Sequence, residues 1–248
     1  VVLITSPGDF DRAGFVSAVR SAYPATSIQR GISNAGSEVS FAEELEVLEG
    51  APWIYEELHL ETLGGRSLRF RISPMSFFQT NTLATERLYG RIREWAHHTQ
   101  CPTLHDLYGG AGGIAFSCSD LVEQVWSVET VAAASEDGRV NAALNHIENV
   151  SFHTEKVEAY LKRCLLEGVD MNASAVVLDP SRAGLHPKAL RRLLELRPPH
   201  VCYVSCNPKI LAQELPVLLE HYTLTGLEGF DLFPHTRHVE VLAMLKRK

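Results

Sequence analysis

The chain has 248 residues, 45% of them apolar, and its 23 basic against 30 acidic side chains leave a net charge of −7. This composition is typical of a globular protein with a substantial core, and the acidic balance argues against nucleic-acid binding over the whole surface. The sequence shows no apolar run of about 18 residues that would span a membrane, no signal peptide, and no C-x-x-C pair for zinc among its five cysteines. We therefore predict a cytoplasmic protein without a membrane segment, disulfide framework or metal site, and its start without Met fits a fragment.

The first 72 residues predict a small α+β lobe. A short helix is expected at 15–22, and glycines with asparagine at 31–36 indicate turns. Strands are expected at the apolar runs 1–5, 53–60 and 68–72. The predicted domains are therefore 1–72 and 73–248.

From residue 73 onward, strands and helices alternate, beginning with a helix at 81–95 whose apolar side chains share one face. Further strands are expected at 103–108, 124–128, 150–153, 175–178 and 201–205, and further helices at 131–145, 155–167, 187–196 and 209–220. This alternation predicts a parallel sheet with helices on both faces, in which ligands bind at the carboxyl ends of the strands. An apolar hairpin, 222–233 with 238–245, follows.

A glycine-rich segment, 105–113 (HDLYGGAGG), ends one predicted strand and opens a helix. Glycines at such a turn let the backbone approach a ligand closely, although NAD, FAD and S-adenosylmethionine sites all use them, and a tight turn alone also needs them. Glu129 ends the next strand, where a carboxylate accepts hydrogen bonds from ribose hydroxyls. The combination predicts a nucleoside-containing cofactor, and the loop lacks the strict G-x-G-x-x-G dinucleotide turn.

Three polar residues stand out at later strand ends. Cys206 follows a strand and precedes Asn207-Pro208, so we expect it to face the crevice with its thiolate favoured by a helix N-terminus; a small buried residue is the alternative. Glu240 lies in an apolar run, where burial would raise its pKa, unless it faces water on an edge strand. Asp179 begins an Asp-Pro turn at the carboxyl end of the sheet.

Basic residues gather in three places that are candidate RNA contacts. Each is more typical of a solvated face than of a nucleic-acid site. The clusters are Arg66 with Arg69 and Arg71, Arg87 with Arg91 and Arg93, and Lys188 with Arg191 and Arg192.

Taken together, these segments make the chain resemble the RNA uracil-5-methyltransferases, which form 5-methyluridine in ribosomal and transfer RNA. The similarity spans about 72–248. It is carried by the motifs SFFQTN at 76–81, DLYGG at 106–110, Val128-Glu129, DPSRAGL at 179–185, SCNP at 205–208 and DLFPHT at 231–236, continuing to Glu240. Many relatives also carry an N-terminal RNA-binding barrel and four cysteines for an iron–sulfur cluster, neither of which this sequence shows.

The resemblance implies a Rossmann-like class I S-adenosylmethionine-dependent methyltransferase sheet, an α/β fold with the small lobe before it. It implies that Gln79, Tyr108, Glu129 and Asp179 contact S-adenosylmethionine, that Cys206 is the nucleophile and that Glu240 is the proton acceptor. The expected reaction is methylation of uracil carbon 5 in RNA through a covalent cysteine adduct, with ribosomal RNA favoured over transfer RNA. Phe77, Phe78 or Phe233 would stack on the captured base, unless they belong to the core.

Several alternatives stay open. A nucleotide-dependent oxidoreductase would need the dinucleotide fingerprint that is lacking here. A methyltransferase acting on another base, at an exocyclic amine, would need no cysteine, and a non-catalytic RNA-binding protein of the same fold would transfer no methyl group.

Overall fold

The computed structural model describes residues 1–34, 42–74 and 76–248, and the chain forms two compact units. Unit 1 comprises Val1–Glu56 and Phe70–Phe77, and unit 2 comprises Glu57–Arg69 and Phe78–Lys248. The chain passes between the units within both strands of a two-stranded ribbon, β4 (Ile54–Leu60) and β5 (Arg66–Ile72). The domain division at residue 72 stays a prediction.

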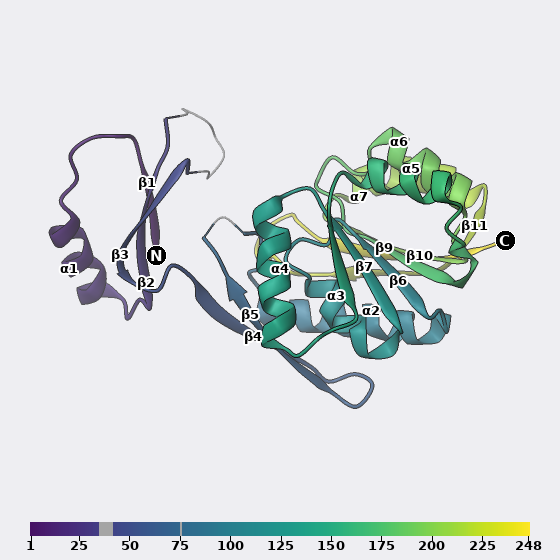
Figure 1. The fold of residues 1–248 in the computed structure, drawn as a ribbon, viewed down its shortest axis with the longest axis horizontal. Coiled ribbons are helices and arrows are strands. Elements are labelled where there is room, and N and C mark those ends of the chain that lie inside the picture. Colours follow the sequence, from purple (N-terminus) through teal and green to yellow (C-terminus); the bar gives the residue numbers. More distant parts are fainter. Residues whose placement is uncertain (35–41, 75) are drawn as a thin grey trace. The chain divides into compact units, whose positions relative to one another are not determined.

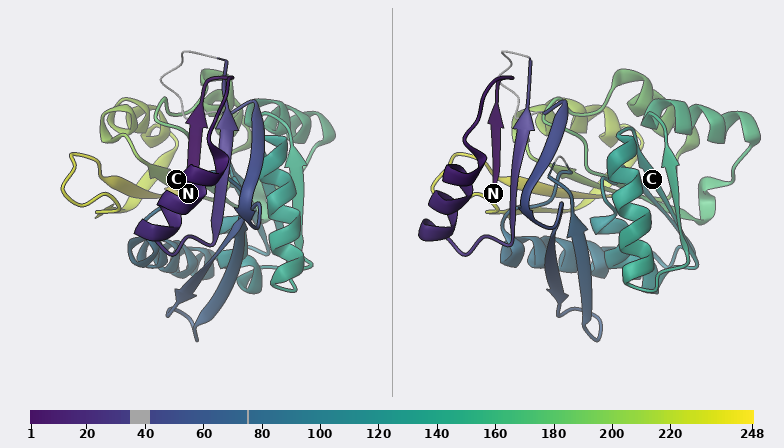
Figure 2. Two further views of the ribbon diagram at one scale, coloured as in Figure 1. Left: turned by 90° about the vertical axis from the view of Figure 1, so that its left-hand side faces the viewer. Right: turned by 60° about the vertical axis from the view of Figure 1, so that its left-hand side comes forward.

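Unit 1 is built on a three-stranded sheet in the order β1-β2-β3, with one helix beside it (Figure 2). β1 (Val2–Thr5) runs parallel to β2 (Ser27–Ile32), and β3 (Glu44–Gly50) is antiparallel to β2. The helix α1 (Arg12–Ala22) starts at Asp11, whose carboxylate accepts a hydrogen bond from the Gly14 amide.

The prediction of a turn at Gly31 was wrong, because Gly31 lies inside β2. Residues 35 and 36 of the predicted turn region lie outside the described residues. A side chain at Gly31 has no room, since its Cβ would lie 2.7 Å from the Cβ of Ala42. The sequence did not predict β2, because its buried positions include polar side chains and so do not form an apolar run. One of them, Arg30, is satisfied by Thr5 Oγ1 at 2.9 Å and by the ring of Phe10.

Unit 2 is built on a seven-stranded sheet in the order β11-β12-β10-β9-β6-β7-β8 (Figure 1). Its strands are β6 (Thr103–Leu107), β7 (Gln124–Glu129), β8 (Val150–Thr154), β9 (Ser174–Leu178), β10 (His200–Ser205), β11 (Tyr222–Phe230) and β12 (Glu240–Arg247). The pairs from β10 to β8 are parallel, and β12 alone runs antiparallel to both of its neighbours. The predicted parallel sheet is thus confirmed, and the C-terminal hairpin extends it at the yellow end of the chain (Figure 2).

Helices cover both faces of this sheet, as predicted from the alternating pattern (Figure 1). One face carries α2 (Thr82–Thr99), α3 (Gly113–Cys118) and α4 (Ala132–Leu144); Phe116 of α3 and Gly138 of α4 both meet the ring of Phe152 on β8. The other face carries α5 (Val157–Glu167), α6 (Pro187–Leu196) and α7 (Pro208–Leu219). Short 3₁₀ turns follow α3 at Ser119–Leu121 and precede β9 at Met171–Ala173. No helix in the described part of the chain is long and apolar enough to cross a membrane.

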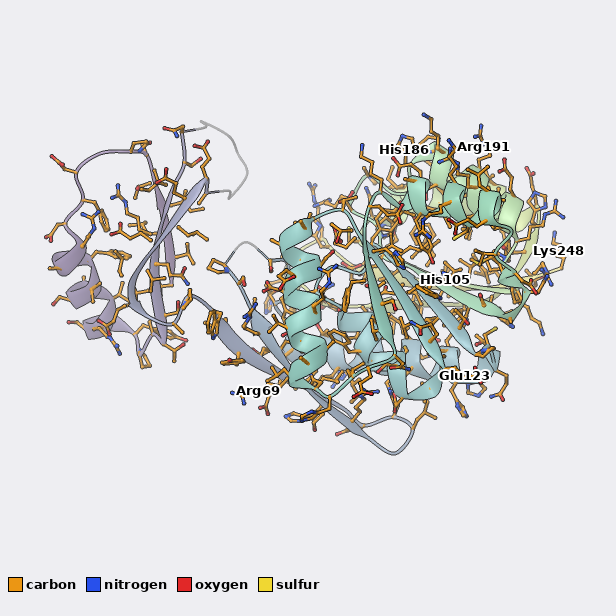
Figure 3. All side chains as sticks on the ribbon, viewed as in Figure 1. Arg69, His105, Glu123, His186, Arg191 and Lys248 are labelled. Carbon is orange, nitrogen blue, oxygen red and sulfur yellow. The ribbon has the colours of Figure 1, made fainter. Side chains whose placement is uncertain are left out.

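The interior of unit 2 also holds polar side chains that are hydrogen-bonded in place. His105 of β6 contacts the Tyr160 hydroxyl at 2.7 Å and Ser174 Oγ at 3.3 Å, and burial lowers its pKa to about 4. Figure 3 shows His105 among packed side chains, whereas Arg191 extends from the outer side of α6. His105 therefore serves the core as a neutral imidazole.

Arg93 corrects one of the predicted basic clusters, because this guanidinium is completely buried. Its Nη2 lies 3.0 Å from Asp120 Oδ2, and it also donates to the carbonyl of Ser117. Arg66 pairs with the same aspartate. The predicted cluster of Arg87, Arg91 and Arg93 is therefore not a continuous surface patch. Arg93 lies in the core, where it faces neither water nor RNA.

We expect Asp120→Ala to lower the free energy of unfolding by about 3 kcal/mol, because it leaves Arg93 buried without a counter-charge. Arg93→Met should cost clearly less, since it removes the buried charge itself. Urea unfolding measures both. Glu195→Ala, which breaks an exposed pair with Arg191, is the control and should cost under about 1 kcal/mol. Equal losses for Asp120→Ala and the control would contradict this account.

Candidate active site

Four strand ends meet where the strand order of the sheet reverses. β6 lies between β7, which follows it in sequence, and β9, so the loops after β6 and β9 leave in different directions. The amide of Asp179 donates to the carbonyl of Leu107 at 3.2 Å, and this hydrogen bond connects the two loops where they leave the sheet. The end of β10 and the start of β12 lie at the same edge, because β12 is antiparallel.

The register of β10 and β12 brings Cys206 beside Glu240. Ser205 pairs with Val241, and the next positions along the two chains are Cys206 and Glu240. Directly opposed residues of an antiparallel pair point to the same face of the sheet. The thiol is half-buried, and Glu240 is only 4% exposed. A sulfur and a carboxylate thus share one end of the sheet.

Three carboxyl groups gather in this region with raised pKa values. Burial, followed by the charges of Glu240 and Asp106, raises the pKa of Asp179 to about 8. Burial raises the pKa of Glu240 to about 7, and it raises the pKa of Asp106 to about 7 although the Ala115 amide donates to that side chain at 3.1 Å. Mutually repelling, poorly solvated carboxyls are typical of functional sites, and they suit a cationic ligand.

The Cys206 thiol differs from its predicted state. Burial raises its pKa above the ordinary value, and the charges of Glu240 and Asp179 raise this pKa further. The positive charge of Arg182 lowers it by less than these three raise it. The expectation of a favoured thiolate is not met, because burial and two carboxyls raise the pKa of this thiol. The resting residue is a thiol near neutral pH.

The glycine-rich loop after β6 is open at Gly110, where an added Cβ would meet no atom within 4 Å, and is tightly packed at Gly109. A Cβ at Gly109 would lie 2.3 Å from Ser127 Oγ and 2.8 Å from Asp106 Oδ2, so no side chain fits there. Asp106 Oδ1 and Ser127 Oγ are buried without a hydrogen-bond partner among the described residues. Such orphaned polar atoms beneath a glycine loop are a place for ligand hydrogen bonds. Sequence reasoning did not select Asp106, although a charged residue inside an apolar strand was the available signal.

The two predicted cofactor residues of this loop, Tyr108 and Glu129, lie together. Tyr108 has a left-handed backbone with φ of 70°, and its amide donates to Val128 at the end of β7. The Glu129 carboxylate accepts from the amides of Gly110 at 3.1 Å and Val131 at 2.7 Å. Glu129 therefore holds the glycine loop in its present shape.

Gln79 is buried two residues before the N-cap of α2. The cap residue, Asn81, donates from its side-chain amide to the carbonyl of Leu232 at 3.2 Å, which ties the start of α2 to the loop after β11. Among the described residues, no hydrogen bond joins Gln79 to Cys206 or to the glycine loop. The structure therefore brings five of the six predicted site residues together in two neighbouring sets, without Gln79.

The loop that carries Asp179 and Arg182 is fastened to the strand and helix around Cys206. The Glu214 carboxylate accepts from the Leu185 amide at 2.9 Å and from the Tyr203 hydroxyl at 2.6 Å. Asn207 donates to the carbonyl of Arg182 at 3.0 Å. These hydrogen bonds set the position of the loop relative to the thiol. No local sequence pattern indicates this role of Glu214 and Asn207.

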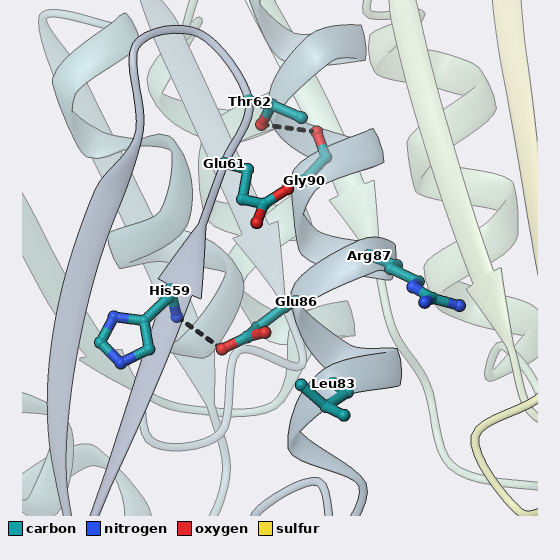
Figure 4. Close-up of a pocket in the computed structure, with 7 residues that line it drawn as sticks. All are labelled: His59, Glu61, Thr62, Leu83, Glu86, Arg87 and Gly90. Atoms are coloured by element: carbon teal, nitrogen blue, oxygen red, sulfur yellow. Dashed lines mark hydrogen bonds between the residues drawn. The ribbon is translucent and has the colours of Figure 1, made fainter.

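A separate hollow of about 250 Å³ lies between the β4–β5 ribbon and α2 (Figure 4). Its polar groups are engaged with each other: Glu86 accepts from the His59 amide at 2.6 Å, and Thr62 donates to the carbonyl of Gly90 at 3.3 Å. Arg87 points away from the ribbon in this view. No group of three or more His, Cys, Asp or Glu side chains among the described residues is arranged to hold a metal ion.

Comparison with known proteins decides the family. Residues 42–248 match the sequence model of the tRNA (Uracil-5-)-methyltransferase family. The chain belongs to this family. An uncharacterized RNA methyltransferase of Clostridium tetani is 35% identical over an alignment that covers 100% of this chain and 52% of that protein. One from Caldanaerobacter subterraneus is 37% identical, covering 87% and 45%. The chain thus spans about half the length of these curated members.

Solved structures agree with the family assignment. The Pyrococcus abyssi tRNA (uracil-54, C5)-methyltransferase, in complex with S-adenosyl-L-homocysteine, superposes with a TM-score of 0.75 at 27% identity, covering 98% of this chain and 55% of that one. An S-adenosylmethionine-dependent methyltransferase from Agrobacterium tumefaciens, at 12% identity and a TM-score of 0.61 over 92% of this chain and 79% of that one, shares the fold alone. The Rossmann-like methyltransferase fold predicted from the sequence is confirmed.

Proposed function

We propose that this family member methylates carbon 5 of a uracil in RNA, with Cys206 as the nucleophile and Glu240 as the base. The observation that carries the proposal is the register of β10 and β12. Continued by one residue beyond the Ser205–Val241 pair, it sets Cys206 opposite Glu240, whose charge acts on the thiol. An enzyme that methylates an exocyclic amine would need no thiol at this place.

We propose S-adenosylmethionine as the methyl donor, with Gln79, Tyr108, Glu129 and Asp179 contacting it. When bound, it supplies an electrophilic methyl group on a positively charged sulfur. The residues present fit such a group: Asp106 Oδ1 is a buried oxygen without a partner among the described residues, and the position beside Gly110 is open. The carboxyls with raised pKa values would gain stabilisation from a nearby cation.

Cys206 is needed because carbon 5 of uracil is a weak nucleophile. The thiol gives up its proton to solvent in the open cavity, and the resulting thiolate forms a bond from sulfur to carbon 6 of the base. The electrons of the carbon 5–carbon 6 double bond move toward the carbonyl at carbon 4, which gives an enolate. Carbon 5 of that enolate is then nucleophilic enough to accept the methyl group.

Glu240 would complete the reaction. After methylation, carbon 5 carries both the methyl group and its original hydrogen, and the sulfur–carbon 6 bond is still present. The Glu240 carboxylate takes the hydrogen as a proton, its electrons restore the double bond, and the thiolate leaves. A carboxyl with a pKa of about 7 suits this step, because it is partly deprotonated at neutral pH and accepts a proton readily.

The base must leave any stack or helix to reach the thiol. Among the predicted stacking residues, Phe77 has a side chain that is 71% exposed, whereas Phe78 and Phe233 are half-buried. Phe233 lies on the loop between β11 and β12 that leads to Glu240, and we propose it as the aromatic contact for the captured base.

The proposal is tested with RNA that carries 5-fluorouracil. Fluorine replaces the hydrogen on carbon 5, so the base has no proton to remove there. The methylated adduct should therefore stay on Cys206 and be found on the corresponding peptide by mass spectrometry. The complete protein and a substrate that it methylates with ordinary uracil are required. Turnover of ordinary RNA without any adduct from the fluorinated RNA would refute the covalent mechanism.

The class of RNA is a separate question. We keep ribosomal RNA as the predicted target, although the family description names tRNA. Mapping 5-methyluridine in ribosomal and transfer RNA from cells with and without the protein identifies the target. Loss of a transfer-RNA position alone would show that the ribosomal prediction is wrong.

A further inference from the structure

A cavity of about 390 Å³ opens beside the proposed nucleophile, and its lining is strongly basic. Cys206 lies in its wall together with Asn207, and three cations surround it: Arg182 from the loop after β9, Lys209 from the first turn of α7, and Arg237 from the β11–β12 loop. All three side chains are exposed. Three separate segments thus contribute one positive charge each to the same opening.

These charges are unusual in a chain with a net charge of −7, because they are not neutralised. Most arginines here have ion pairs, such as Arg66 with Asp120 and Arg191 with Glu195. Among the described residues, Arg87, Arg182 and Arg237 are the arginines whose side chains have no ion pair, hydrogen bond or ring contact; Lys209 likewise has none. Two of the three unpartnered arginines flank one cavity.

The backbone segments that carry these cations are held in place. Thr236 Oγ1 donates to the carbonyl of Phe233 at 2.8 Å and accepts from the His238 amide at 3.1 Å, which shapes the turn that contains Arg237. The carbonyl of Arg182 accepts from Asn207, the neighbour of Cys206. The cations are therefore presented from ordered loops around the cavity.

We propose that Arg182, Lys209 and Arg237 form a phosphate subsite for single-stranded RNA, which binds the backbone next to the reacting uridine. This inference rests on the proposed function, because it takes RNA as the substrate. Its physical basis is charge: every phosphate of RNA is negative, and three exposed cations without ion pairs surround one opening. Phosphate contacts fix position without reading sequence, so the subsite would seat the strand and leave base choice to the pocket.

The test compares two double variants of the complete protein that remove the same charge. Lys209→Gln with Arg237→Gln removes two of the three cations of the proposed subsite. Lys162→Gln with Lys246→Gln removes two exposed lysines, from α5 and from β12, and is the matched control. The measurement is the affinity for a fluorescent oligouridylate of about ten nucleotides at several salt concentrations. Each lost phosphate contact with single-stranded RNA should reduce the slope of log affinity against log salt by about 0.7.

For the subsite variant we expect the slope to fall by about 1.4 and the affinity at 0.15 M salt to fall roughly 14-fold, whereas the control should keep the wild-type slope. Equal slopes for the two double variants would overturn the subsite. The 5-fluorouracil adduct, measured on the wild-type protein, is an independent readout: its absence refutes the methylation mechanism, whereas a normal adduct with equal slopes refutes only the phosphate subsite.

Discussion

Cys206→Ala should abolish methylation of uracil, with a loss of roughly 10⁴-fold or more, because no other group in the site can activate carbon 5 by adding to carbon 6. The measurement is methyl transfer to RNA by the complete protein, together with binding of S-adenosylmethionine, which should persist. The half-buried thiol can be replaced by a smaller side chain with limited disturbance of the fold.

Cys202→Ala is the matched control for this prediction. Cys202 lies on the same strand, is completely buried and pairs with Met244 of β12. Burial holds the pKa of its thiol well above the ordinary value, so it is a packing residue. This variant should lose stability and keep methyl transfer. Activity that survives Cys206→Ala would favour methylation of an exocyclic amine instead.

Glu240→Gln should slow turnover by about 10³-fold and should make a methylated RNA adduct accumulate on Cys206 with ordinary uracil. The reason is the order of steps: the thiol adds and carbon 5 is methylated, but no carboxylate removes the remaining hydrogen, so the sulfur cannot leave. Mass spectrometry of the denatured protein after one turnover measures the adduct. Free 5-methyluridine formed at the wild-type rate would show that another base serves.

The same substitution should stabilise the fold at alkaline pH. Burial raises the pKa of Glu240 from 4.5 to about 7, so the folded protein retains a proton that the unfolded chain releases, and stability falls as pH rises from about 4.5 to about 7. A shift of about 2.5 units at 1.36 kcal/mol each sets an upper bound of about 3 kcal/mol. Urea unfolding at pH 8 should show the variant to be more stable, and the difference should disappear near pH 4.

Neighbouring groups titrate in the same range, so a comparison of variants is needed. Asp179, with a pKa raised to about 8, should produce its own loss of stability with rising pH in both proteins. The difference in unfolding free energy between wild type and Glu240→Gln reports the contribution of Glu240. It also includes a contribution from Asp179, because the Asp179 carboxylate is no longer repelled by the charge of Glu240. A destabilised variant at pH 8 would mean that the Glu240 carboxylate is paired favourably in the folded protein.

By itself the sequence determined the alternation of strands and helices in unit 2, since apolar periodicity and turn residues are properties of adjacent residues. The observed helix α6 (Pro187–Leu196) has the predicted bounds, and β10 differs from its prediction by one residue. Motif order also indicated the family that the comparisons establish. The weakest predictions fell where strands carry buried polar residues, as in β2, because a partner distant in sequence satisfies those groups.

Only the tertiary structure decided how the chemistry-bearing residues meet. The insertion of β12 between β10 and β11 brings Glu240 to the position next to Cys206, and no local pattern specifies that register. Burial and two neighbouring carboxyls raise the pKa of the Cys206 thiol, which was expected to be lowered. Asp120 pairs with Arg93, which was predicted to be a surface cation and lies in the core. The physical reason is common to all three: desolvation and Coulomb energies depend on distances between atoms that lie far apart along the chain.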